Sequence, residues 1–469
     1  MNSPSTYTRA PALRWSARAG YAAGDFGCNM YWQAIALYLY FFYTDVLNIP
    51  PATAGIAFGI ASVYDAVADP VMGAIADRTR TRWGRFRPYL LLGTIPLAIS
   101  FGAMFYVPDL DGMALVVYAT ASHVLMRTCY TVVNIPYLAL SASLSSDAGE
   151  RATLAGMRMV CAAAAAVLVA ALMPRAVSAI GGRQPYFVVA CAMAALASVV
   201  LLACARSVRE TPASAIAPAG DGASSVLKVA AADFLAFWGL LLRHRPLTQV
   251  VGCIVVLSVA LTMFSKCLIY WFKYGLGRAD LVPVALLVPA LMVFLCSPLW
   301  ALVARRYSKR NAWIAGSAVA AVGYLGFWLD GGASIPLTLG WIALVGIGLS
   351  SLFVNMWAML PDTVEFIEWR GGTRSEAKVA GFAVFAQKVA LALNAVLLGI
   401  LLESAGYVAN QSLSAATLDG IKAMMCLIPL GGLVLTVLLL WSYPISPAFH
   451  ARMVQELAAR RNEDSSARV

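Results

Sequence analysis

Residues 64–91 read YDAVADPVMGAIADRTRTRWGRFRPYLL, and this stretch decides the fold. Up to Ala76 its only charges are the carboxylates of Asp65 and Asp69, and its second half holds five arginines. A helix needs about 20 apolar residues to cross the hydrocarbon core of a bilayer, and loops rich in Arg and Lys stay in the cytoplasm. The stretch therefore predicts the end of a membrane-spanning helix and the cytoplasmic loop that follows it.

The whole chain has the composition of a membrane protein. Of its 469 residues, 61% are hydrophobic and 12% are charged, whereas about a quarter of an ordinary soluble domain is charged. These values predict an all-α membrane protein with twelve transmembrane helices. The apolar segments lie at residues 19–44, 51–77, 88–107, 113–139, 153–174, 185–206, 247–273, 281–304, 311–330, 336–361, 378–402 and 417–443.

Basic residues gather in alternate loops. A net charge of +11 would suit a nucleic-acid partner, but clusters such as residues 78–87 and 305–310 alternate with loops such as residues 47–53, which hold none. This pattern is typical of membrane topology. It predicts no nucleic-acid partner, and a multi-pass protein among the lipids of a bacterial inner membrane with both termini in the cytoplasm. The exceptions are Arg175, Arg183 and Arg278.

A linker divides the chain into two groups of six predicted helices. Residues 209–225, RETPASAIAPAGDGASS, have the composition of a flexible connection. In the second group, SPLWALVARRYSKRNA (297–312) repeats the change from apolar to basic that follows Asp69 in the first. Two such groups predict a transporter built from parallel repeats. The predicted domains are a six-helix bundle at residues 1–208, a cytoplasmic linker with a surface helix at 209–245, a second six-helix bundle at 246–446 and a cytoplasmic tail at 447–469.

Charges inside the predicted helices are candidate functional groups, because an ionised side chain at the bilayer centre costs at least about 2.5 kcal/mol. Asp65 and Asp69 share one helix face, and two neighbouring carboxylates stay ionised only beside a positive charge. They are predicted to form a cation site for H+ or Na+, or else a salt bridge that only locks helices together. Lys388, ten residues after Lys378, is the best basic partner, unless it extends to the interface.

Further polar residues on the predicted helices are candidate substrate ligands, since amides and aromatic rings bind and stack on sugars. The alternative is hydrogen bonding between helices. These candidates are Asp25, Asn29, Trp32, Arg127, Asn134 and Lys266. Charges at helix ends are candidate gating groups, and Asp77 and Arg85 are expected to pair in one transport state only. The acidic gating candidates are Asp45, Asp77, Asp362 and Glu365.

Several of these segments resemble the glycoside-pentoside-hexuronide:cation symporter family of the major facilitator superfamily. They are LYFFYTDV (39–46), the stretch quoted first, NIPY (134–137), ERATLAGMR (150–158), YWFKYGLG (270–277) and the run from PDTVEF (361–366) to ESAGY (403–407). The resemblance implies the fold of that superfamily, a sugar or glycoside substrate and a coupling cation. It also implies that Asp65 and Asp69 bind the cation and that Lys388 is their charged neighbour.

The sequence departs from that family at two acidic positions. Asn29 and Asn134 stand where sodium-coupled members that carry melibiose have aspartates, and Leu138 replaces a tryptophan that stacks on the sugar. Fewer acids leave H+ as plausible as Na+ and argue against a melibiose-like substrate. The chain is more similar to glucuronide-type members, which favours a uronide bound by Arg127, Arg158 or Lys266.

The sequence thus predicts a secondary symporter for a sugar, glycoside or uronide. A membrane-embedded enzyme is not predicted, because His123, His244 and His450 form no cluster and no cofactor motif is present. Two alternatives stay open. One is a carrier of a non-sugar solute such as a lysolipid on the same fold, and the other is a sugar sensor that does not transport.

Overall fold

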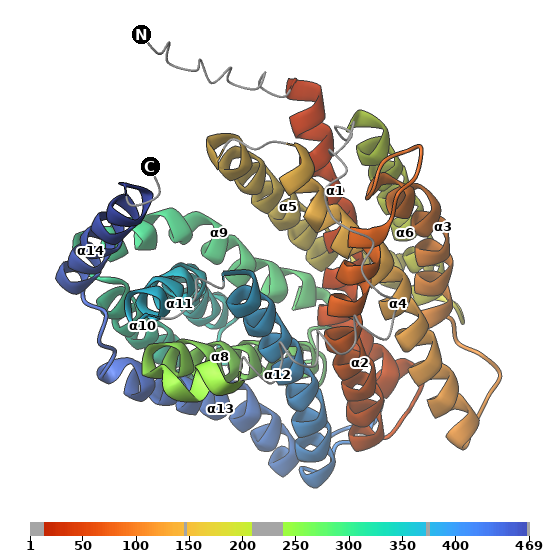
Figure 1. Ribbon diagram of the computed structural model, residues 1–469. Coiled ribbons are helices and arrows are strands. Elements are labelled where there is room, and N and C mark those ends of the chain that lie inside the picture. The colour runs from red at the N-terminus through yellow and green to blue at the C-terminus, as the bar shows by residue number, and fades with distance from the viewer. Residues whose placement is uncertain (1–13, 145–147, 209–237, 372–375, 467–469) are drawn as a thin grey trace. The chain divides into compact units, whose positions relative to one another are not determined.

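The computed structural model describes residues 14–144, 148–208, 238–371 and 376–466. Every named element in these ranges is a helix, as Figure 1 shows. The long helices are α1 (Trp15–Ala34), α2 (Pro51–Arg78), α3 (Arg87–Met104), α4 (Gly112–Leu144), α5 (Ala148–Ile180), α6 (Pro185–Ser207), α8 (Arg245–Tyr270), α9 (Val282–Arg306), α10 (Lys309–Asp330), α11 (Ile335–Trp369), α12 (Glu376–Ser404), α13 (Ala415–Trp441) and α14 (Pro447–Ser466). The short turns are the π-helical η1 (Ile35–Leu39), η2 (Phe42–Val46) and η3 (Trp271–Gly275) and the 3-10 turn η4 (Ala279–Leu281).

The helices α1 to α6 and α8 to α13 lie where the apolar segments predict them, and the predicted all-α membrane fold is confirmed. Within the described ranges, nine helices are long and apolar enough to cross a membrane. The other three, α1, α3 and α4, fall below that hydropathy; α1 carries Arg18 and Asp25, and α4 carries Arg127. Most of the predicted surface helix before Arg243 lies outside the described residues, and its described part, residues 238–243, is helical.

The first of two compact units contains the described residues of Met1–Ile35 and Ala68–Ala223. In it α1 packs against α5 and α6, and α3 packs against α4 and α6. Arg18 on α1 donates two hydrogen bonds of 2.6 and 2.7 Å to the carboxylate of Glu150 on α5. Tyr21 on α1 stacks on Tyr137 of α4, with ring centres 5.0 Å apart. Polar and aromatic contacts therefore join α1 to its neighbours.

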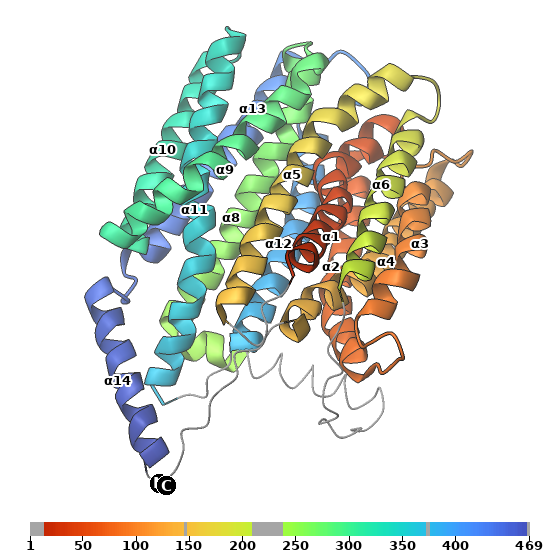
Figure 2. The same ribbon diagram turned by 90° about the horizontal axis from the view of Figure 1, so that it is seen from above.

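The second unit contains the described residues of Ala36–Val67 and Ser224–Val469. Its helices α10 and α11 run side by side, as Figures 1 and 2 show, and α8 packs against α12 and α13. A Cβ atom on Gly348 of α11 would lie 2.4 Å from the backbone nitrogen of Ala320 on α10. Only glycine permits this close approach of two backbones, which small residues make possible between membrane helices.

The first half of α2 packs in the second unit, against α12. A Cβ atom on Gly55 would lie 2.5 Å from the carbonyl oxygen of Ala395, and one on Gly399 would lie 2.4 Å from that of Pro51. Residues 36–67 are thus fixed to helices that follow them by more than 300 positions. The four predicted domains stay a prediction.

Candidate functional site

Asp65 and Lys388 form an ion pair inside the second unit. The Nζ atom of Lys388 on α12 lies 2.7 Å from Oδ2 of Asp65 on α2, and the two side chains are 11% and 1% exposed. The close approach of α2 to α12 brings them together. Two charges withdrawn from water here offset each other, which is the condition for keeping either of them ionised.

Asp69 lies one helical turn after Asp65, in the first unit, and is half-buried. Its Oδ1 atom accepts a hydrogen bond of 2.9 Å from the hydroxyl of Thr131 on α4. Pro70 follows within α2 and has no N–H to donate to the carbonyl of Ala66. Carboxylate, hydroxyl and carbonyl oxygens are the ligands that hard cations prefer. Asp69 and the carbonyl of Ala66 on α2, with the hydroxyl of Thr131 on α4, supply these atom types.

Arg158 pairs with Asp25 in the first unit. Its Nη2 atom lies 3.0 Å from Oδ1 of Asp25, and its guanidinium lies 5.3 Å from the ring centre of Tyr137 and 5.9 Å from that of Tyr21. The side-chain amide of Asn29 donates to the backbone carbonyl of Asp25 at 2.9 Å. Three predicted substrate ligands are thus brought together and bind one another.

Trp32 and Arg127 form a second polar group of the first unit. The guanidinium of Arg127 lies 5.0 Å from the indole ring centre, and its Nε donates to Nε2 of buried His123 at 3.2 Å. Tyr130 tilts against Trp32 at 6.2 Å, and Asn134 is half-buried further along α4. Aromatic faces beside a guanidinium combine stacking with recognition of an acidic group.

Lys266 belongs to the second unit and is 2% exposed. Its Nζ atom lies 4.2 Å from the ring centre of Phe58 and 4.9 Å from that of Tyr40. A cation over aromatic faces is stabilised by their electron density. In this structure Lys266 therefore contacts rings of the segment at residues 36–67.

The predicted gating carboxylates lie beside basic side chains. Asp77 accepts a hydrogen bond of 2.5 Å from Arg85 in the loop after α2. Both oxygens of Asp362 on α11 lie 2.7 Å from Nζ of Lys309 at the start of α10. Glu365, also on α11, lies 2.8 Å from Nε2 of His450 on α14. These pairs tie helix ends to each other.

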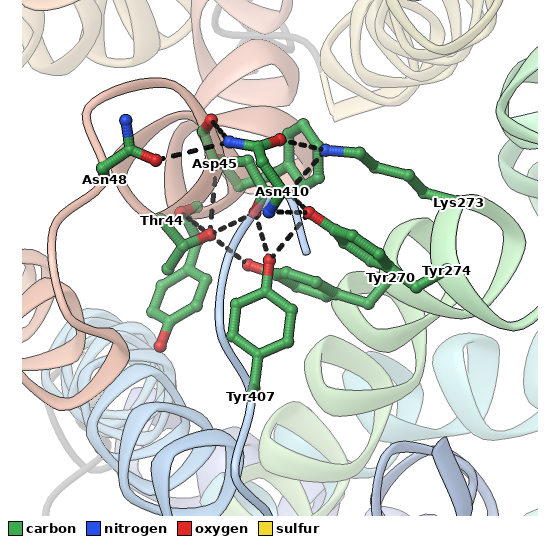
Figure 3. Close-up of polar contacts among 10 residues, drawn as sticks. Thr44, Asp45, Asn48, Tyr270, Lys273, Tyr274, Tyr407 and Asn410 are labelled. Atoms are coloured by element: carbon green, nitrogen blue, oxygen red, sulfur yellow. Dashed lines mark hydrogen bonds and ion pairs between the residues drawn. The ribbon is translucent and has the colours of Figure 1, made fainter. Parts of the chain in front are cut away.

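A cluster around Asp45, drawn in Figure 3, was not predicted beyond the charge of Asp45 itself. Its side chain is 1% exposed. Its Oδ1 atom accepts from Nζ of Lys273 at 2.7 Å and from the hydroxyl of Tyr274, and its Oδ2 atom accepts from Thr44 at 2.8 Å and from Tyr407 at 2.7 Å. We call Thr44, Asp45, Tyr270, Lys273, Tyr274, Tyr407 and Asn410 the Asp45 cluster.

The sequence held only a weak signal for this cluster. Lys273 follows Asp45 by 228 positions and Tyr407 by 362, so no local spacing joins them. The three segments that meet were quoted above for their family resemblance, but resemblance does not say which residues touch.

The described residues contain no group of three or more His, Cys, Asp or Glu side chains that could hold a metal ion. The nine cysteines are free thiols.

Comparisons with known proteins agree with one another. A family model described as "MFS/sugar transport protein" matches residues 20–447. The chain is 30% identical to the glucuronide carrier protein homolog of Escherichia coli (strain K12), over 96% of each chain. It is 29% identical to the isoprimeverose transporter of Lactiplantibacillus pentosus, over 99% of this chain and 95% of that one. A crystal structure of the nucleoside transporter NupG, 13% identical, superposes with a TM-score of 0.64 over 92% of this chain and 100% of that chain, a likeness of fold alone.

Proposed function

The chain belongs to the MFS/sugar transport protein family, and on this premise we propose that it is a secondary active symporter that imports a sugar, glycoside or uronide with H+ or Na+ by alternating access. Its family consists of transport proteins, so the chain is a transporter and not an enzyme. Relatives named as carriers of glucuronide and isoprimeverose support a sugar substrate over a lysolipid, and transport over sensing.

The buried ion pair of Asp65 and Lys388 carries the proposal. An unpaired carboxylate within a membrane helix is costly. In the empty carrier, Lys388 neutralises Asp65, so the protein reorients without an uncompensated charge. The coupling cation competes with the ammonium for the carboxylate and binds better in the state that binds sugar. That difference in affinity couples the two ligands: the cation raises the affinity for sugar by the same factor as sugar raises the affinity for the cation.

Asp69 is the second acid of the proposed cation site. It is half-buried and accepts a hydrogen bond from the hydroxyl of Thr131, so its environment differs from that of Asp65. A proton needs only one carboxylate, whereas Na+ needs several oxygen ligands. Asp65 and Asp69, with Thr131 beside the second, support both ions as candidates.

The proposed substrate ligands lie mainly in the first unit. Trp32 offers an aromatic face to a sugar ring, and Arg127 offers a guanidinium to an acidic substituent. Arg158 is balanced by Asp25, so only part of its charge is available to a substrate. Asn29, Asn134 and Lys266 complete the set, and a uronide is the substrate class that these groups favour.

We place the protein in a bacterial inner membrane with both termini in the cytoplasm, because its basic loops alternate with loops that are poor in Arg and Lys. The pairs Asp77–Arg85, Asp362–Lys309 and Glu365–His450 then lie at cytoplasmic helix ends. There they act as gates that close and open with the transport state.

Uptake into proteoliposomes tests the function. Purified protein is reconstituted, and uptake of radiolabelled methyl glucuronide, methyl glucoside and methyl xyloside is measured with a Na+ gradient or a pH gradient imposed alone. We expect concentrative uptake of at least one sugar under one gradient, and no inhibition by lysolipid. Uptake that equals that of protein-free vesicles for every sugar under both gradients, or inhibition of that uptake by lysolipid alone, would overturn the proposal.

A further inference from the structure

The segment at residues 36–67 is part of the second unit, and an ion pair near each of its ends joins it to other helical segments of that unit. Near one end Asp45 pairs with Lys273 at 2.7 Å, and near the other Asp65 pairs with Lys388 at 2.7 Å. Each carboxylate is 1% exposed, and each lysine comes from a distant helical segment, η3 or α12. The peptide chain joins this same segment, through Ile35 and Ala68, to the first unit. Two acid–lysine pairs therefore add to the helix packing at Gly55 and Gly399 in holding the segment in place.

The Asp45 carboxylate organises its end of the segment. One ammonium and three hydroxyls donate to its two oxygens, and the hydroxyl of Thr44 lies 2.7 Å from that of Tyr270. Lys273 is 28% exposed, so the balancing charge reaches water while the carboxylate does not. A buried carboxylate with this many donors is stable only while the donors stay in place.

The backbone around the cluster is irregular on every side. Asp45 lies in η2 and Lys273 in η3, which are both π-helical, and such turns are often found at functional sites. Asn410, in the loop before α13, has a φ of 57°. Its side-chain amide donates to the backbone carbonyl of Asp45 at 2.8 Å and its Oδ1 accepts from Lys273 at 3.0 Å. Side-chain hydrogen bonds thus join η2, η3 and the loop before α13 to one another.

We propose that Asp45 is a positioning residue of the transport cycle, and that its contacts with Lys273, Tyr274 and Tyr407 form a latch that opens and recloses as the carrier changes state. The latch rests on the proposed function, because a cycle of states is needed for it to act. The coupling cation weakens the ion pair of Asp65 with Lys388. Of the two ion pairs of the segment, that of Asp45 with Lys273 then remains intact. Cation binding at one end then makes opening at the other end easier.

A native thiol reports on the latch. Cys267 is 0% exposed and lies one turn before Tyr270 on α8, and its neighbour Lys266 lies over Tyr40 of the latched segment. Cys253, fourteen residues earlier on the same helix and so about 21 Å away along its axis, is 1% exposed and donates to the carbonyl of Thr436 on α13. The full-length protein in lipid nanodiscs is treated with N-ethylmaleimide, and modification of each cysteine is followed by mass spectrometry.

We expect wild-type Cys267 to react slowly but completely. Asp45→Asn removes the charge that holds Lys273, and Lys273→Met leaves the buried Asp45 carboxylate without its balancing ammonium. Each should raise the rate at Cys267 at least about tenfold, and Lys273→Arg should restore most of the protection. Asp280→Asn breaks the exposed pair with Arg278 and is the matched control, with no change expected.

An unmodified wild-type Cys267 would mean a static contact and would overturn the latch. An unchanged rate in both Asp45→Asn and Lys273→Met, or a parallel rise at Cys253, would also overturn it. Labelling needs no sugar or gradient, so its failure is distinct from failure of the uptake experiment.

Discussion

The ammonium of Lys388 lies 2.7 Å from the carboxylate of Asp65, and neither side chain is more than 11% exposed. Burying two charges is costly, but burying one alone costs more, because a lone charge has no partner to offset its lost hydration. Removing one member of the pair therefore differs from removing both, and stability and transport respond differently to these two changes.

Lys388→Met should lower the free energy of unfolding by about 3–5 kcal/mol, because it removes the positive charge that lies beside the buried Asp65 carboxylate. The double variant Asp65→Asn with Lys388→Met should recover most of that loss, since neither member of the pair then carries a charge. Unfolding in mixed micelles of rising SDS content measures both. Concentrative uptake should be absent from both variants. Equal stability of the single and double variants would contradict the paired-charge account.

Asp69→Asn should abolish accumulation of sugar against its gradient while leaving insertion and folding intact. The amide keeps an acceptor for Thr131 but neither binds a proton nor supplies a charge to Na+. Exchange of labelled for unlabelled sugar without a gradient separates binding from coupling, and should persist. Thr131→Val is the comparison, since it removes the hydrogen bond and keeps the acid. Normal accumulation in Asp69→Asn would exclude Asp69 from the cation site.

Hydropathy and charge predicted the helices and identified Asp65, Asp69 and Lys388 as the unusual residues, because charges within apolar segments are visible in the sequence. The same reasoning could not show that Asp45 contacts Lys273 and Tyr407, because those contacts depend on tertiary packing across 228 and 362 positions.

Nothing in the sequence indicated that the first half of α2 packs against α12. That packing depends on backbone contacts at Gly55 and Gly399, and a glycine in a membrane helix does not reveal which helix it meets.

Gly348→Ala should destabilise the second unit. The added Cβ would lie 2.4 Å from the backbone nitrogen of Ala320 and 2.5 Å from the carbonyl oxygen of Gly316, and backbone atoms do not move aside as side chains do. We expect a loss of about 1–3 kcal/mol, as for other overpacked sites. Gly340→Ala on the same helix is the matched control, because its Cβ would meet nothing within 4 Å; it should be neutral or stabilising by up to about 1 kcal/mol. Thermal unfolding in detergent would show no difference between them if α10 and α11 did not pack this closely.

Glu456 should make the docking of α14 depend on pH. The indole N–H of Trp369 donates to its Oε2 at 2.6 Å, and Arg452 donates to its Oε1 at 2.9 Å. The Trp369 hydrogen bond, and then Arg452, hold the pKa of Glu456 below its usual 4.5. A lowered folded-state pKa stabilises the docked helix above pH 4.5, and this contribution is lost as the pH falls through the lowered value. Amide exchange in α14, corrected for intrinsic rates, should rise on acidification in the wild type but not in Glu456→Gln.

Asp25→Asn should shift the preference of the carrier towards acidic sugars. Asp25 balances Arg158 at 3.0 Å, so removing its charge leaves the guanidinium available to a carboxylate of the substrate. A partly exposed ion pair is worth about 0.2–1 kcal/mol, which corresponds to a rise of about 1.4- to 5-fold in the kcat/KM ratio of methyl glucuronide over methyl glucoside. Arg158→Lys, which keeps the charge but loses the planar contact with Tyr137, serves as the comparison and should leave that ratio nearly unchanged. If Asp25→Asn lowered uptake of both sugars equally, the Asp25–Arg158 pair would hold α1 to α5 without taking part in substrate selection.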